Sequence, residues 1–162
     1  MRIPLPFRAL VATVLPLTVG GLGPVLLTTA GVWRGIPAWR LVFAVPMAAG
    51  LALLAWSILL FAIEGQGTLA PIDPPTVFVA RGPYRVTRNP MYLGVLLWLT
   101  GLASLTGARS LGWDTCIVAA GFHTFVTLVE EPGLRRRFGA SYEAYTKSVP
   151  RWLGLRRGTR AS

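Results

Sequence analysis

The sequence predicts an all-α, multi-pass membrane helix bundle, and three observations carry this prediction. Of the 162 residues, 53% are hydrophobic and only 14% are charged, which is too apolar for an ordinary soluble domain. Several charge-free stretches are long enough to cross a hydrocarbon core of about 30 Å. The sixteen Lys and Arg residues cluster between these stretches, a pattern typical of membrane topology, so no nucleic-acid partner is predicted.

Four apolar stretches are predicted to span the membrane, and they belong to a single membrane domain, residues 1–162. The first contains Pro16, Gly20, Gly21, Gly23 and Pro24, so it should be kinked or locally irregular. It is longer than the apolar core of a secretory signal peptide, about 7 to 15 residues. The four predicted membrane helices are residues 9–33, 41–63, 89–108 and 110–129.

The segments outside these stretches have their own patterns. Residues 64–88 are rich in Gly and Pro and predict an ordered loop, whose apolar, β-branched middle, 76–80, should be extended chain packed over neighbouring structure. Residues 132–149 predict an amphipathic helix lying along the membrane surface, followed by a basic tail, 150–162. The apolar stripe of that helix is Leu134, Phe138, Tyr142, Tyr145 and Val149.

The basic residues predict the orientation of the chain. With the N-terminus in the cytoplasm, only Arg34, Arg40 and Arg109 of the sixteen Lys and Arg residues lie outside. The positive-inside rule therefore places both termini and the loop 64–88 in the cytoplasm, in a protein of the cell (inner) membrane. Cys116 is the sole cysteine, so no intramolecular disulfide or cysteine metal cluster, and no other metal site, is predicted. The sequence does not specify the oligomeric state.

Two short motifs flank the third and fourth stretches on the cytoplasmic side. In the first, Arg-Asn-Pro-Met-Tyr-Leu-Gly, Asn89 is predicted to cap a helix that begins at Pro90. Gly94 permits close approach of a neighbouring helix or a ligand, and is included in the predicted cofactor site. Some forty residues later come Glu130 and Glu131. A helix N-terminus suits a carboxylate and an acidic pair suits an ammonium, so the two motifs permit a cationic cofactor that ends in an α-amino acid.

The acidic pair also has a purely structural interpretation. Charges near a membrane core cost about 2.5 to 3.5 kcal/mol at mid-helix, so Glu130 and Glu131 need partners. Both acids can lie at headgroup level, paired with Arg135 or with arginines of the preceding loop. Arg88, directly before the helix start, is predicted to pair with Glu131 or with an anionic group of the substrate.

These motifs resemble those of the isoprenylcysteine carboxyl methyltransferase and phospholipid methyltransferase family of integral membrane methyltransferases. The resemblance covers roughly residues 65–153 and is specific through the order and spacing of short motifs. They are Arg81-Gly82-Pro83-Tyr84, Arg88-Asn89-Pro90-Met91-Tyr92-Leu93-Gly94, Glu130-Glu131-Pro132, Phe138-Gly139, Tyr142, Tyr145 and Val149-Pro150-Arg151.

The resemblance implies a membrane enzyme that transfers a methyl group from S-adenosylmethionine to a lipophilic small molecule or lipid carrying an amine, thiol, hydroxyl or carboxylate. It implies that Glu130 binds the amino group of the cofactor, with Glu131 adjoining. The other implied cofactor-binding residues are Thr76, Val77, Phe78, Val79, Tyr84, Asn89, Pro90, Met91 and Tyr92. In the prenylcysteine branch, Asn89 is replaced by His, and Val126 by an Arg that meets the substrate carboxylate. The missing Arg argues against a prenylcysteine substrate.

The predicted catalytic residues are Arg88, His123 and Glu131. Alignment of donor and acceptor supplies about 7 to 11 kcal/mol at best, so methyl transfer needs no strong base. An amine acceptor must nevertheless be neutral, and His123, the only histidine, lies two helical turns before Glu130 on about the same face, where it can accept a proton or orient the acceptor. The alternative is a histidine buried in the bundle and bonded to a threonine or a backbone carbonyl.

Two other functions compete with methyl transfer. A membrane reductase similar to the sterol reductases would use a nicotinamide cofactor, whose phosphates favour more basic and fewer acidic side chains than Glu130 and Glu131 provide. A non-enzymatic membrane scaffold would explain the basic tail but not the paired motifs.

Overall fold

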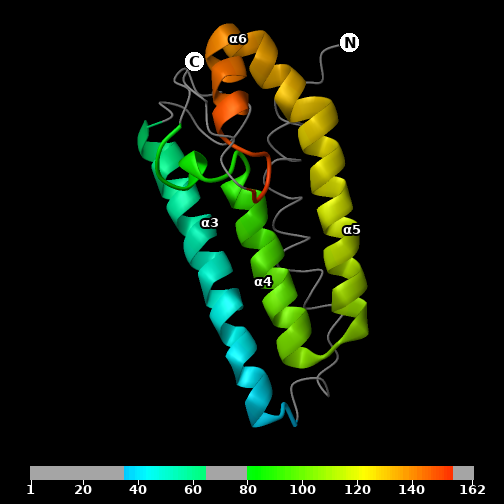
Figure 1. The fold of residues 1–162 in the computed structure, drawn as a ribbon. Helices are drawn as coiled ribbons and strands as arrows, with labels where there is room; N and C mark the ends of the chain where they lie inside the picture. Colours follow the sequence, from blue (N-terminus) through cyan, green and yellow to red (C-terminus); the bar gives the residue numbers. More distant parts are fainter. Residues whose placement is uncertain (1–34, 65–79, 155–162) are drawn as a thin grey trace.

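The computed structural model describes residues 35–64 and 80–154, which form a helical bundle without strands in these two ranges (Figure 1). In chain order the elements are the 3-10 turn η3 (Ala38–Phe43), α3 (Ala44–Glu64), the 3-10 turn η4 (Gly82–Arg85), α4 (Pro90–Thr106), α5 (Arg109–Phe125), the π-helical segment η5 (Val126–Glu130) and α6 (Glu131–Ser148). Helices α3, α4 and α5 run antiparallel to their neighbours in sequence, and α6 covers the end where α4 begins (Figure 1). The predicted all-helical class is confirmed for these residues, whereas the predicted span 9–33 lies outside them.

The boundaries of α4 follow from its terminal residues. The helix begins at Pro90 as predicted, because the fixed φ of proline suits the first helical position. It ends at Gly107, whose φ of 70° is left-handed and whose N–H donates to the Ala103 carbonyl at 2.8 Å. The predicted side-chain cap by Asn89 is wrong: its amide nitrogen donates to the backbone carbonyl of Arg151 at 2.9 Å, because the C-terminal segment lies against it.

Glycines bring α3 and α4 into close contact. A Cβ added to Gly94 would lie 2.8 Å from the carbonyl oxygen of Gly50 and 2.9 Å from the backbone nitrogen of Leu54. A Cβ on Gly101 would lie 2.8 Å from the backbone nitrogen of Met47. Small residues of this kind let helix backbones approach closely. The neighbour that approaches Gly94 is therefore α3.

Within residues 35–64 and 80–154, two helices are long and apolar enough to cross a membrane, judged by length and composition. They are Ala38–Leu60 and Arg109–Ser148, while α4, with 17 residues, is a shorter apolar helix. Large apolar side chains are exposed on the outer surfaces of the bundle, including Trp56 at 56% and Ile117 at 71%. Such a surface fits a lipid environment better than water.

The helical path from α5 into α6 is interrupted twice. The segment η5 is π-helical, and Gly139 (φ 50°, ψ −124°) has a non-helical conformation inside α6. The predicted surface helix 132–149 is therefore bent at Gly139, and its second half turns back toward the start of α4 (Figure 1). Its apolar stripe packs into the protein. Tyr142, Tyr145 and Val149 are buried, and Leu134, Phe138 and Ala80 pack against them.

Candidate active site

The two predicted motifs meet at the end of the bundle where α3 ends and α4 begins (Figure 1). Tyr92, in the first turn of α4, donates its hydroxyl to Oε2 of Glu130 at 2.9 Å. The Tyr92 ring also packs on Phe122 of α5, with ring centroids 4.7 Å apart. The antiparallel path of α4 and α5 brings the motifs together although the two bonded residues are 38 positions apart.

The residues after α6, Val149 to Trp152, cross the start of α4, and we call them the C-terminal strap. The backbone N–H of Arg88 donates to the Pro150 carbonyl at 2.9 Å. The Arg151 carbonyl accepts from Oγ1 of Thr87 at 3.0 Å and from Nδ2 of Asn89 at 2.9 Å. Thr87 and Asn89 are buried beneath the strap. Three hydrogen bonds therefore attach the strap to the loop that precedes α4.

An ion cluster joins the strap to α6. Glu131 is buried, with 7% of its side chain exposed. Arg151 donates two hydrogen bonds to it, from Nε to Oε1 at 2.6 Å and from Nη2 to Oε2 at 2.9 Å. Arg88 adds a second guanidinium, with Nη1 3.1 Å from Oε1, as predicted. Hydrogen bonding to Glu131 raises the pKa of Arg151 further above its normal value, so Arg151 stays charged. Both oxygens of Glu131 are thus occupied by protein, and the cluster keeps a net positive charge.

Glu130 has a different environment from its neighbour. It is half-buried, and among the described residues no Lys or Arg forms an ion pair with it. Arg135, one of the partners considered from the sequence, binds Glu143 at 3.2 Å instead. The expected pairing with an arginine of the preceding loop is therefore found for Glu131 but not for Glu130. Glu130 is the acid whose charge remains available to a cation.

Tyr84 lies near this charge. Its carbonyl, on η4, accepts a hydrogen bond of 2.6 Å from the hydroxyl of Tyr145. Burial, and then the nearby charge of Glu130, raise the pKa of Tyr84 well above its ordinary value, so the phenol stays neutral. An uncharged aromatic ring beside a free carboxylate suits a ligand that combines a cation with an apolar or aromatic part.

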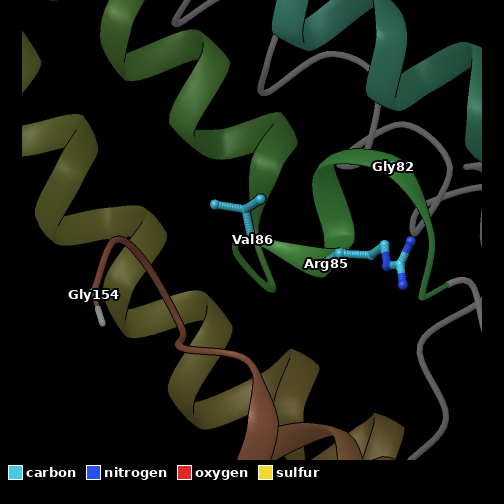
Figure 2. Close-up of a pocket in the computed structure, with 4 residues that line it drawn as sticks. All are labelled: Gly82, Arg85, Val86 and Gly154. Atoms are coloured by element: carbon cyan, nitrogen blue, oxygen red, sulfur yellow. The ribbon is translucent and has the colours of Figure 1, made fainter. Parts of the chain in front are cut away.

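A cavity of about 540 Å³ opens beside the loop before α4 (Figure 2). It is lined by Gly82, Arg85, Val86 and Gly154. Val86 points to the side of the loop where Gly154 lies, whereas the Arg85 side chain extends the other way (Figure 2). None of these residues belongs to the predicted cofactor set.

Residues 39–141, more than half of the chain, match the phospholipid methyltransferase family. The chain belongs to this family. It is a membrane methyltransferase that uses S-adenosylmethionine and acts on a lipid-type acceptor. Membership supports methyl transfer over the reductase and scaffold alternatives. No curated protein and no solved structure shows a significant match to the chain. The matched range includes both motifs and ends before the strap.

The structure describes only part of the predicted cofactor set of this methyltransferase. Thr76, Val77, Phe78 and Val79 lie outside the described residues. Tyr84 lies on η4, and Asn89, Pro90, Met91, Tyr92 and Gly94 lie at the start of α4. Of these, Tyr84 and Tyr92 are near Glu130, Asn89 holds the strap, and Gly94 contacts α3. Their contact with the cofactor stays a prediction.

His123 occupies neither of the environments expected from the sequence. It is exposed on α5, and its Nδ1 accepts a hydrogen bond of 3.2 Å from Nε1 of Trp152. The π-helical segment lies between His123 and Glu130, and its wider turn means that a seven-residue spacing no longer implies a shared face. Trp152 itself packs against the core of α4 and α5.

Sequence reasoning missed the roles of Arg151 and Trp152. The sequence predicts both residues to lie in a basic tail. The signal that points to Arg151 is the Val149-Pro150-Arg151 motif of the family resemblance. Val126 was recognised as a departure from the prenylcysteine branch. It is only 1% exposed, within the π-helical segment, so its site has no room for an arginine.

Proposed function

We propose that this methyltransferase holds the amino-acid end of S-adenosylmethionine between Glu130 and Arg88, and that its acceptor enters laterally from the bilayer. The observation that carries the proposal is the half-buried Glu130 carboxylate, bonded by Tyr92 and lacking a basic partner among the described residues. Nε of Arg88, whose guanidinium pairs with the adjacent Glu131, is buried without a hydrogen-bond partner in the described structure. A free carboxylate and a free guanidinium N–H suit the ammonium and carboxylate of an α-amino acid.

When bound, S-adenosylmethionine supplies an electrophilic methyl group on a sulfonium. The residues of this chain bind and orient it. Glu130 attracts the positive end, and the neutral rings of Tyr84 and Tyr92 offer an apolar wall. Of the other residues predicted as catalytic, Arg88 binds the carboxylate of the cofactor through Nε in this proposal, and Glu131 holds the Arg88 guanidinium in place through Nη1. Alignment and exclusion of water then account for most of the rate.

We further propose four membrane helices, with residues 9–33 added to α3, α4 and α5, and a cytoplasmic site. The distribution of charge supports this orientation. Arg40 and Arg109 lie at the end of the bundle opposite the site. The other described basic residues lie at the site end: Arg81, Arg85, Arg88, Arg135, Arg136, Arg137, Lys147 and Arg151. Positive residues favour the cytoplasmic face, so the cofactor would enter from the cytosol.

The acceptor group is an amine, thiol, hydroxyl or carboxylate of a lipid or lipophilic small molecule. A prenylcysteine carboxylate is disfavoured, because Val126 stands buried where that branch carries an arginine. Incubating membranes of the source cells with methyl-labelled cofactor, followed by mass spectrometry of the lipid extract, identifies the group that gains a methyl.

Isothermal titration of the purified protein in detergent tests the cofactor site. Wild type should bind S-adenosylmethionine, and Glu130→Ala should weaken binding at least about tenfold, the equivalent of one lost charge-assisted contact of about 1.4 kcal/mol. Glu143→Ala is the matched control, because Glu143 is an exposed acid of α6. Absence of binding in wild type, or equal binding in the Glu130 and Glu143 variants, would overturn the proposal.

A further inference from the structure

The hydrogen bond between Trp152 and His123 determines which imidazole nitrogen carries the proton. An indole N–H is a donor only, so the nitrogen that accepts it, Nδ1 of His123, must present a lone pair. The proton of the neutral ring then lies on Nε2. The two rings are nearly parallel, with an interplanar angle of 28° and centroids 6.4 Å apart. His123 is thus directed to offer an N–H group and has no free lone pair.

The donor in this bond is held firmly. Trp152 follows Arg151, which is fixed by its two bonds to Glu131 and by the carbonyl contacts with Thr87 and Asn89. The indole packs against a buried cluster that joins α4 to α5. This cluster comprises Val95, Leu99, Val118 and Phe122. The indole N–H therefore cannot easily turn away from the imidazole.

The position of His123 connects it to the site. It follows Phe122, whose ring packs on Tyr92, and Tyr92 binds Glu130. His123 itself is exposed on α5, one helical turn from the exposed Ala120. An N–H group on an apolar surface gains from meeting an acceptor oxygen, because an unpaired donor away from water is costly. A lipid-type acceptor carries such oxygens.

We propose that Trp152 is a positioning residue that holds His123 in the Nε2–H tautomer, and that His123 donates a hydrogen bond to an oxygen of the methyl acceptor instead of removing its proton. The inference rests on the proposed function for the identity of the ligand, but the tautomer can be measured without any ligand. His123 thus binds the methyl acceptor and does not act as the base that the sequence suggested.

Nitrogen NMR of the single histidine tests the first half. In protein labelled with ¹⁵N-histidine, in detergent micelles at mildly alkaline pH, Nδ1 should show the shift of an unprotonated nitrogen and Nε2 that of a protonated one. Trp152→Phe keeps an aromatic ring on the cluster and removes the N–H, so a mixture of tautomers should appear. A protonated Nδ1 in wild type, or an unchanged spectrum in Trp152→Phe, would overturn the proposal.

A methyl-transfer assay tests the second half of the proposal, the hydrogen bond from His123 to the acceptor. The assay uses labelled cofactor and lipid extract of the source membranes, diluted into phosphatidylcholine nanodiscs. His123→Ala and Trp152→Phe should raise KM for the acceptor about five- to tenfold, as expected for one hydrogen bond of about 1 to 1.4 kcal/mol, with smaller changes in kcat. His123→Gln should recover most of this loss, because an amide both accepts and donates. If kcat falls much more than KM rises in His123→Ala, and His123→Gln does not recover it, His123 acts as a base and the inference fails.

Titration with S-adenosylmethionine separates this inference from the proposed cofactor site. All three variants should bind the cofactor like wild type, since none alters Glu130 or Arg88. Loss of cofactor binding in wild type would contradict the proposed function and leave the NMR result to decide the tautomer. Normal cofactor binding with an unchanged KM in the variants would contradict the inference alone.

Discussion

Replacing Arg151 with methionine should destabilise the protein, because it removes one of the two arginines that bind the buried Glu131. The change removes two hydrogen bonds, 2.6 and 2.9 Å long, from a carboxylate that is 7% exposed. Loss of one partner from a fully buried pair costs about 3 to 5 kcal/mol. Arg151 is one-third exposed, and Arg88 remains 3.1 Å from Glu131, so water and the second guanidinium compensate in part. We therefore expect a loss of about 2 kcal/mol in the free energy of unfolding.

Equilibrium unfolding in mixed micelles with increasing dodecyl sulfate measures this loss. Arg136→Met is the matched control, because Arg136 is exposed on α6, and it should stay within about 0.5 kcal/mol of wild type. A double-mutant cycle with Glu131→Gln isolates the interaction between Arg151 and Glu131. The loss of unfolding free energy in the double variant should be smaller than the sum of the losses in the two single variants by at least about 1 kcal/mol. Stability of Arg151→Met equal to that of the control, or strict additivity, would refute the importance assigned to the cluster.

Three further outcomes are expected. Gly94→Ala should lower the free energy of unfolding by about 1 to 3 kcal/mol, because the added Cβ meets the backbone of α3. Gly112→Ala is the control and should be neutral or stabilising, because nothing lies within 4 Å of its added Cβ. Equal effects of the two variants would contradict the close helix contact. Tyr145→Phe should lower stability by about 1 to 2 kcal/mol, since the Tyr84 carbonyl loses its 2.6 Å partner, and an unchanged thermal midpoint would argue against that bond. Val126→Arg should yield little folded protein on size-exclusion chromatography and no prenylcysteine methylation, because a site that is 1% exposed cannot take a charge. A folded, active variant would show that the site can adapt to an arginine.

The local features of the chain were predictable because they depend on near neighbours in sequence. The start of α4 at Pro90 follows from the fixed φ of proline, and the apolar stretches follow from composition. The stripe from Leu134 to Val149 was also identified by its spacing. Its packing partner was not, because the bend at Gly139 turns the second half of α6 onto the protein.

From the sequence, the site could be predicted only as the place where the two motifs come together. The sequence indicates that both lie at one end of the bundle, and it names the pairing of Arg88 with Glu131. It does not indicate that Arg151 competes for the same acid, since that contact joins positions 20 residues apart through the path of the strap. It does not predict the role of Asn89 either, whose partner lies 62 positions away.

The sequence by itself therefore determined a helical membrane protein, its family and the pair of acids at the site, because composition and short motifs are properties of the chain. Only the tertiary structure decided that Glu131 is neutralised by two arginines while Glu130 stays free, and that Trp152 binds His123. The physical reason is that the free energy of a charge or a polar group depends on the atoms that surround it after folding. Glu130 and Glu131 are identical neighbours in sequence, yet the π-helical segment and the strap give them different surroundings.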